Sequence, residues 1–335
     1  MKIKTLLSLG VLLLLGLPAN TQEDYSLLAT DTLNLAEKEL DKIPRYVWGK
    51  SVLKYLSLSN NHLKKVPRKV KKLSSLEHLD LSINEIKSLP PELWCLNKLK
   101  TLDLGYNEIS VLPPEIQYLR NLENLTIRAN RLTYLPPEMG KLTALTTLSI
   151  SENQLTCLPP ELFTLSNLRA FQLWNNPLSI QFKYFEQLPD LEELGLSGLQ
   201  LDTLSGDIGK LNKLTYLNLS HNNLKSLPVH FGMLKQLTWL ELWDNKLTSL
   251  DSSIGEASQL EFLHLGKNQL TMIPPEISKL TNLTLLFLNN NQLTSLPNGI
   301  SNLTNLSGLF LQGNPIPEQE QTKIKALLPN CTIHF

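Results

Sequence analysis

Residues 99–121, LKTLDLGYNEISVLPPEIQYLRN, decide the fold of this chain. They follow the spacing L-x-x-L-x-L-x-x-N-x-L, in which the run x-L-x-L alternates at the period of two that is typical of a strand. Leu102 and Leu104 are therefore expected to face a core, and the residues beside them to face outward. Asn107 comes next, where its amide can bond backbone groups that lack a ladder partner. The Pro-Pro pair that follows begins a return segment, because proline lacks an N–H but fits the first turn of a helix.

A unit of this kind cannot bury its apolar side alone and needs a copy on each side. The same sequence pattern recurs every 23 residues in twelve copies, whose first leucines are Leu53, Leu76, Leu99, Leu122, Leu145, Leu168, Leu191, Leu214, Leu237, Leu260, Leu283 and Leu306. The asparagine that ends each strand forms a predicted asparagine ladder of Asn61, Asn84, Asn107, Asn130, Asn153, Asn176, Asn222, Asn245, Asn268, Asn291 and Asn314, with Leu199 as the exception. A uniform period predicts one solenoid whose stability sums over repeats.

The signature N-x-L-x-x-L-P-x-x-I-x-x-L resembles the 23-residue class of the leucine-rich-repeat superfamily, seen in plant intracellular Ras-group proteins, disease-resistance-type repeats and secreted bacterial proteins. The resemblance covers residues 30–335. It implies an α/β repeat solenoid, a horseshoe with a parallel β-sheet on its concave face and short helical or extended turns on its convex face. It also implies a protein that binds other proteins, usually on the concave face, and that has no chemistry of its own. It names no ligand, because the motif residues are the buried ones.

The chain divides into four predicted parts. Residues 1–21 are expected to be a signal peptide, with Lys2 and Lys4 before a twelve-residue apolar run that is too short to span a bilayer. Thr21 makes the cleavage site imperfect, so cleaved export and an uncleaved anchor are both considered. Residues 22–50 are expected to be an N-terminal cap with one degenerate repeat, residues 51–316 the twelve repeats, and residues 317–335 a C-terminal cap with a helix and a short strand.

The pattern fails at residues 177–206, where Gln181 and Phe182 replace the usual Leu-Pro. One interpretation is sequence drift or a local change of curvature between two repeat blocks. The other is a bulged convex loop in which Phe182, Tyr184 and Phe185 are partly exposed as a second contact site.

Charge and cysteine content exclude several classes of protein. The chain has 31 Lys and Arg residues and 31 Asp and Glu residues, so no basic stripe is expected. We therefore do not expect nucleic acid to be a partner. Cys95 and Cys157 lie three repeats apart, about 14 Å at about 4.8 Å per strand, whereas a disulfide needs Cα atoms within about 7 Å. Cys331 lies farther away. We expect no disulfide, and we expect the first two cysteines to be small packing residues.

No catalytic, metal or cofactor site is predicted. The six histidines lack H-x-x-x-H spacing, and no C-x-x-C pair occurs. Asp80 and Asp103 lie one repeat apart on the concave face, but no deep pocket is expected that would shift a carboxyl pKa there. The chain is therefore predicted not to be an enzyme.

The informative positions are those that the consensus leaves free on the concave face. The third position of each copy is mostly polar or small in the first seven copies and then becomes large and apolar. We define the concave aromatic ribbon as the predicted ligand-binding residues at the third, fifth and seventh positions: Trp174, Tyr216, Trp239, Trp243, Phe262, Leu285, Phe287 and Phe310. Since aromatic residues are only 7% of the chain, this is a concentration, and it lies where solvent is expected.

Two functions follow from these observations. The first is an exported, non-catalytic scaffold whose concave aromatic ribbon binds a protein, peptide or glycan ligand, without cofactors and without stable membrane insertion after signal cleavage. The second is a structural or adhesive envelope protein in which self-association covers the ribbon. Sequence alone does not give the oligomeric state that would separate them.

Overall fold

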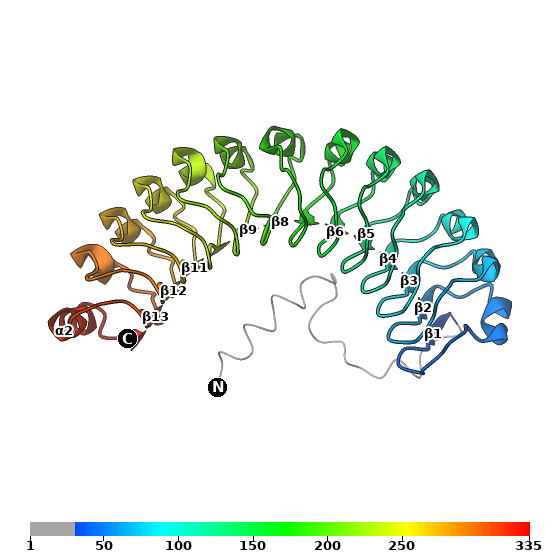
Figure 1. Cartoon of the computed structure of the whole chain (residues 1–335), viewed down its shortest axis with the longest axis horizontal. Coiled ribbons are helices and arrows are strands. Elements are labelled where there is room, and N and C mark those ends of the chain that lie inside the picture. Colours follow the sequence, from blue (N-terminus) through cyan, green and yellow to red (C-terminus); the bar gives the residue numbers. More distant parts are fainter. Residues whose placement is uncertain (1–30) are drawn as a thin grey trace.

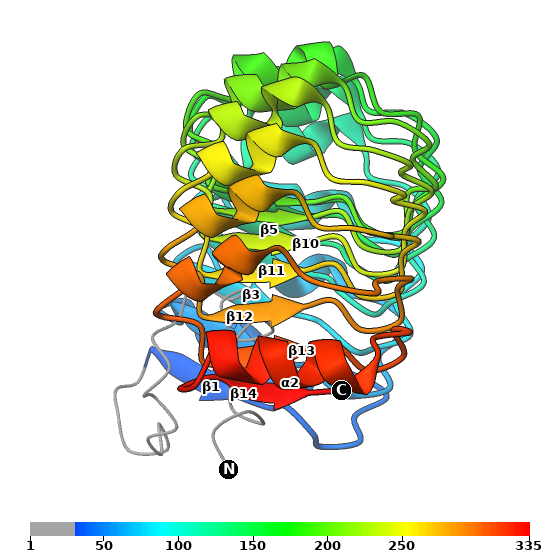
Figure 2. The ribbon, with the colours of Figure 1, turned by 90° about the vertical axis from the view of Figure 1, so that its left-hand side faces the viewer.

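The computed structural model describes residues 31–335, and the predicted signal peptide lies outside the described residues. The described chain is a horseshoe, as predicted, with the strands on its concave side and short turns on its convex side (Figure 1). One parallel sheet runs through it in strict chain order from β1 to β14. Figure 2 shows the turns stacked behind one another along the array, with the C-terminal helix covering the last repeat. No helix in residues 31–335 is long and apolar enough to cross a membrane.

Each strand is three residues long, and each pairs with its neighbours at a fixed offset. Leu102 of β4, for example, lies beside Leu79 of β3 and Leu125 of β5. The strands are β1 Thr32–Asn34, β2 Tyr55–Ser57, β3 His78–Asp80, β4 Thr101–Asp103, β5 Asn124–Thr126, β6 Thr147–Ser149, β7 Ala170–Gln172, β8 Glu193–Gly195, β9 Tyr216–Asn218, β10 Trp239–Glu241, β11 Phe262–His264, β12 Leu285–Phe287, β13 Gly308–Phe310 and β14 Thr332–His334.

The convex side consists of 3₁₀ helices of five or six residues, and an α-helix, α2 (Glu318–Leu327), closes the C-terminal end. The 3₁₀ helices are η3 Arg45–Gly49, η4 Arg68–Lys72, η5 Pro91–Cys95, η6 Pro114–Tyr118, η7 Pro137–Lys141, η8 Pro160–Thr164, η9 Phe182–Gln187, η10 Gly206–Lys210, η11 Val229–Met233, η12 Ser252–Glu256, η13 Pro275–Lys279 and η14 Asn298–Asn302. Proline precedes most of them. In η10 and η12, Ser205 and Asp251 take its place and cap the helix by accepting a backbone N–H.

The core is a continuous column of leucine and isoleucine side chains between the sheet and these turns. The irregular region belongs to it: Phe182 and Phe185 of η9 are buried, and the Phe185 ring packs edge-on to Phe163 at 5.1 Å. Tyr184 is half-buried against Phe163. The interpretation of residues 177–206 as a bulged loop with three partly exposed rings is therefore wrong for Phe182 and Phe185, which pack into the core, whereas Tyr184 is partly exposed.

The ladder asparagines bond the backbone of two adjacent repeats. Asn130 is representative: its Nδ2 donates to the carbonyls of Leu104, Ile127 and Arg128 at 2.9, 3.2 and 3.2 Å. Its Oδ1 accepts from the N–H of Ile109 at 2.9 Å. Asn130 is only 8% exposed, so these groups have little access to water.

The ladder compensates where an asparagine is missing. Leu199 is buried in place of one, and the next ladder residue, Asn222, accepts from the N–H groups of both Leu199 and Leu201 at 3.1 and 3.0 Å. Asn61 does the same at the N-terminal cap, where Lys38 stands in the asparagine position and donates its N–H together with Leu40. At each gap, the side-chain oxygen of one asparagine therefore accepts two N–H groups of the preceding turn.

The residue before each ladder asparagine adopts a left-handed backbone in the repeats. These residues are Asn60, Ile83, Tyr106, Ala129, Glu152, Asn175, Gly198, His221, Asp244, Lys267, Asn290 and Gly313. The consensus does not reveal this requirement, because most of them carry a Cβ. Ile83 is the most costly case, since a β-branched side chain is strongly disfavoured at its φ of 53°.

We expect Ile83→Asn to stabilise the protein by about 1 kcal/mol, because asparagine tolerates the left-handed region better than isoleucine. Urea denaturation would show this as a higher midpoint. Val111→Asn is the matched control: both side chains are 48% exposed, but Val111 is not among the residues with positive φ. An equal change of the urea midpoint in the two variants would contradict the proposal that the backbone of Ile83 is strained.

We expect Asn130→Ala to destabilise the protein by about 1–3 kcal/mol, because it leaves buried carbonyls and an N–H unpaired. Asn314→Ala should cost less, since Asn314 is half-buried beside the C-terminal cap. Chemical denaturation of the two variants compares them directly. Equal midpoints would show that the ladder bonds do not depend on burial.

Candidate functional site

The concave aromatic ribbon forms two rows of contacting rings. In the row at the third position, Trp239 of β10 stacks on Phe262 of β11 with centroids 3.8 Å apart and an interplanar angle of 6°. Tyr216 of β9 continues this row at 6.4 Å from Trp239. In-register side chains on adjacent strands stand about 4.8 Å apart, so planar rings at one register meet face to face. The stacking is thus a direct result of the repeat.

The second row lies at the fifth position, and it contains two histidines, His264 and His334, that the predicted ribbon did not include. Phe287 of β12 stacks on Phe310 of β13 at 4.3 Å and 2°, and His334 of β14 extends the stack at 4.8 Å and 6°. His264 of β11 lies 4.8 Å from Phe287 and 6.2 Å from Phe262, so it joins the two rows. Burial lowers the pKa of His264 to about 4, and its imidazole is neutral at pH 7. The sequence did contain a signal for this missed residue, because His264 is a histidine at the same fifth position as Phe287 and Phe310.

A carboxylate anchors the N-terminal end of the ribbon. Oε1 of Glu241 accepts from Trp239 Nε1 at 2.8 Å and from the Tyr216 hydroxyl at 3.3 Å, and Oε2 accepts from Asn218 Nδ2 at 3.1 Å. Burial raises the pKa of Glu241 in spite of these donors, and it also raises the pKa of the Tyr216 phenol. These hydrogen bonds hold the two rings in place, and the carboxylate has no Lys or Arg partner among the described residues.

Every ring of the ribbon is half-buried. Neighbouring rings cover much of each ring, as where Phe310 is stacked between Phe287 and His334, and the remaining part of each ring is accessible to solvent. The rings therefore cover one another in part and together form a half-buried apolar strip over β9–β13.

The two seventh-position tryptophans do not lie together. Trp174 of the loop after β7 is covered by the Arg128 guanidinium at 4.3 Å, and Arg128 is itself paired with Glu152 at 2.7 Å. Trp243 lies three repeats farther on, with the His221 ring edge-on at 4.5 Å. Trp243 adjoins the ribbon through His264 at 6.1 Å, whereas Trp174 forms a separate site.

The third and fifth positions of the concave face carry acidic side chains and no lysine or arginine. At the third and fifth positions of β2–β13 there is no Lys or Arg, and the acidic residues are Asp80, Asp103, Glu193 and Glu241. Burial raises the pKa of Glu193 and, together with the neighbouring Asp80 charge, raises the pKa of Asp103 to about 6. The expectation that no carboxyl pKa would shift on this face is therefore wrong for Asp103. The sheet itself desolvates side chains without forming a deep pocket.

We expect Asp103→Asn to stabilise the protein by about 1–3 kcal/mol at pH 7 and to have little effect at pH 3.5. The folded pKa of about 6 is above the ordinary aspartate value of 3.8, so the folded state binds more protons between these two pH values and the stability falls as pH rises through that interval. Asparagine keeps an acceptor for the Gly105 N–H, which bonds Asp103 Oδ1 at 2.8 Å. Urea midpoints at the two pH values measure this, with the exposed Asp202→Asn as control. A variant that is less stable at pH 7 would contradict it.

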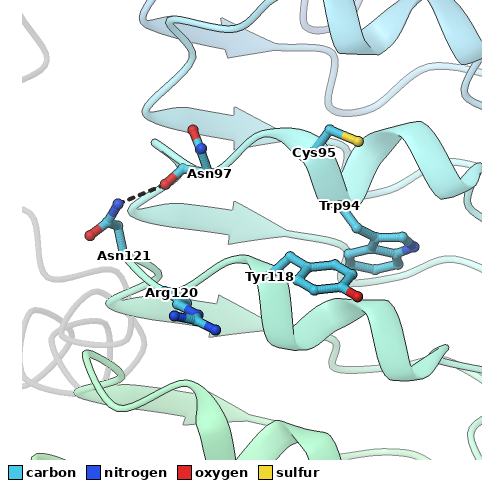
Figure 3. Close-up of a pocket in the computed structure, with 6 residues that line it drawn as sticks. All are labelled: Trp94, Cys95, Asn97, Tyr118, Arg120 and Asn121. Carbon is cyan, nitrogen blue, oxygen red and sulfur yellow. Dashed lines mark hydrogen bonds between the residues drawn. The ribbon is translucent and has the colours of Figure 1, made fainter.

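A shallow pocket on the other side of the repeats is a weaker candidate. It is lined by Trp94, Cys95, Asn97, Tyr118, Arg120 and Asn121 (Figure 3). Its polar contact, from Asn121 Nδ2 to the Asn97 carbonyl at 2.7 Å, recurs from Asn167 to Thr143 and from Asn282 to Ser258. The pocket is therefore an ordinary feature of the repeat.

The cysteines differ from the prediction in their packing. Cys95 and Cys157 are exposed, Cys331 is half-buried, and all three are free thiols. The two exposed cysteines are not packing residues, because they lie at positions outside the buried consensus. Among residues 31–335 no group of three His, Cys, Asp or Glu side chains could hold a metal ion.

The comparisons with known proteins agree with this architecture. Residues 32–130 match the family model described as a leucine-rich repeat region, and residues 120–178, 166–224, 189–247, 214–270 and 258–316 match the leucine rich repeat. The chain belongs to the leucine-rich-repeat family. The predicted family and horseshoe fold are thereby confirmed. No curated protein sequence matches the chain significantly.

Solved structures of this family resemble the chain over most of its length. A leucine-rich-repeat protein of Leptospira interrogans is 32% identical, covers 91% of this chain and 95% of its own, and has a TM-score of 0.76. An internalin of Listeria monocytogenes is 24% identical, with coverages of 91% and 86% and a TM-score of 0.79, and shows the fold alone. A plant peptide hormone receptor solved in complex with RGF2 is 26% identical, with coverages of 81% and 49% and a TM-score of 0.64. Leucine-rich-repeat domains are generally protein-interaction scaffolds, typically without catalysis.

Proposed function

We propose that this protein is an exported, non-catalytic scaffold that binds a protein or peptide ligand along the concave aromatic ribbon. The observation that carries the proposal is the continuous strip of half-buried rings over β9–β13, on a face where the first seven repeats present mostly polar or small side chains. Solvating the accessible part of such a strip has a free-energy cost, and apolar surface of this kind that remains accessible in a folded protein is typical of interaction sites. The peptide complex of the plant receptor supports a peptide-sized ligand by analogy.

The charges beside the ribbon specify the ligand further. Glu241 and Glu193 flank the rings of Tyr216 and Trp239 and have no basic side chain beside them at the third and fifth positions. A ligand that places a Lys or Arg there and apolar side chains over Phe262 and Phe287 would pair these carboxylates and cover the strip. The proposed ligand is therefore an extended segment with a basic residue next to apolar ones.

Export supports this proposal from the sequence and from the relatives. The N-terminal charged start and apolar run resemble a signal peptide. The similar structures include a Listeria internalin and a plant peptide hormone receptor. The competing function is a structural protein whose ribbon is covered by a second copy. Light scattering separates the two, since a concentration-dependent dimer that loses its ligand affinity would favour self-association.

We expect Trp239→Ala to weaken ligand binding by about 2 kcal/mol, because interface energy concentrates in tryptophan and tyrosine near the centre of a patch. The ligand would first be captured from the native extracellular medium, identified by mass spectrometry and titrated calorimetrically. Thr147→Ala, at the same third position on β6, is the matched control and should bind normally. Circular dichroism must show both variants folded, since Trp239 also donates to Glu241. Unchanged affinity in Trp239→Ala would exclude the ribbon as the site.

A further inference from the structure

The strongest feature outside the ribbon is a block of positive charge at the N-terminal end of the horseshoe. Residues 42–76 contain no Asp or Glu and ten basic residues, which are Lys42, Arg45, Lys50, Lys54, Lys64, Lys65, Arg68, Lys69, Lys71 and Lys72. The zero net charge of the whole chain conceals this block, and the expectation that no basic stripe exists is wrong for these two turns.

The block is centred on η4, whose sequence is RKVKK. Several other 3₁₀ helices place a glutamate in their first turn, at Glu92, Glu115, Glu138, Glu161 and Glu276, and η4 has none. Val70 is the buried anchor of the turn, and the four basic side chains around it are all exposed. The difference is therefore confined to the side chains that solvent reaches.

Three of these ten basic residues pair with a carboxylate, Lys54 with Asp31, Lys64 with Glu85 and Arg68 with Glu92, and the lysines of η4 are left unpaired within the described residues. Arg68 lies 3.9 Å from Glu92, whereas Lys69, Lys71 and Lys72 make no ion pair in residues 31–335. The adjacent turn η3, which is in contact with η4, adds exposed Arg45 and Tyr46. We define the basic turn patch as Arg45, Tyr46, Arg68, Lys69, Lys71 and Lys72.

The position of the basic turn patch limits what it can bind. It lies on the outer, convex side of the arc, at the blue end in Figure 1, so it cannot surround a small ligand. Its shape suits a broad, flat anionic surface that meets several cations at once. Tyr46, 55% exposed, and Val52 of the following turn, 60% exposed, add apolar contacts of the kind that enter a lipid headgroup layer.

Unpaired positive charge and exposed apolar side chains thus lie together at the N-terminal convex end of the described chain. We infer that the basic turn patch binds the phosphate headgroups of an anionic phospholipid membrane and thereby sets the protein on the membrane by its N-terminal convex end.

The test is vesicle sedimentation of the full chain. Vesicles of phosphatidylglycerol and phosphatidylcholine should bind the protein much more strongly than phosphatidylcholine alone, and 0.5 M salt should remove the difference. Each cation near an anionic surface is worth about fivefold in partitioning, so K69Q/K71Q/K72Q should lose about 100-fold. K141Q/K225Q/K246Q changes the net charge equally at exposed lysines elsewhere and should bind like the parent. The apolar run is common to all variants, so it cancels in the comparison.

Two outcomes would overturn the inference. One is equal vesicle binding by the two triple variants, with circular dichroism showing both folded. The other is that heparin or duplex DNA binds as tightly as the vesicles do and that Tyr46→Ala changes neither binding. That result would make the patch a site for a soluble polyanion. Membrane binding predicts that Tyr46→Ala weakens vesicle binding severalfold and leaves heparin binding unchanged.

Discussion

The amide of the ladder asparagine is the interaction on which the rest of this protein depends. A strand of three residues ends before the chain can reverse, and the carbonyls of the reversal point toward an apolar core. One asparagine satisfies up to three of them and accepts an N–H from the preceding repeat. The bond spans two repeats, so it requires both turns to have the same shape. This requirement explains why the 23-residue period hardly varies.

The same constraint determines how much could be predicted from the sequence. Because each strand is displaced by one repeat from the last, residues at one position form a column on the sheet, and the columns that hold Trp239 and Phe287 could be written down in advance. The contacts between columns could not. His264 joins two rows only because of the directions that its neighbours' rings take, and Glu241 is half-buried and accepts hydrogen bonds from two aromatic side chains, those of Trp239 and Tyr216. Side-chain packing of this kind depends on rotamers, which the period does not specify.

Predictions for positions that the consensus leaves open were wrong for a related reason. Cys95 and Cys157 were expected in the core because cysteine is usually buried, but the motif already fills the core with leucine and leaves these positions to solvent. The left-handed residue before each asparagine could not be recognised either, because the geometry of the turn imposes this backbone on Ile83 and Ala129 at a cost as well as on glycine. In a solenoid, the local backbone is set by the neighbouring turns more than by the residue that adopts it.

A neutral composition conceals two oppositely charged surfaces that the fold keeps apart. The carboxylates of the concave face lie on strands, where the sheet desolvates them and raises the pKa values of Asp103 and Glu193. The lysines of η4 lie on the convex side, where solvent reaches them on all sides. A rigid array with such surfaces on opposite sides can be held through its outer side while its inner side stays free, because the core between them prevents one site from closing over the other. On the proposed functions, attachment to a membrane at the basic turn patch would leave the aromatic ribbon accessible to a ligand with basic and apolar residues.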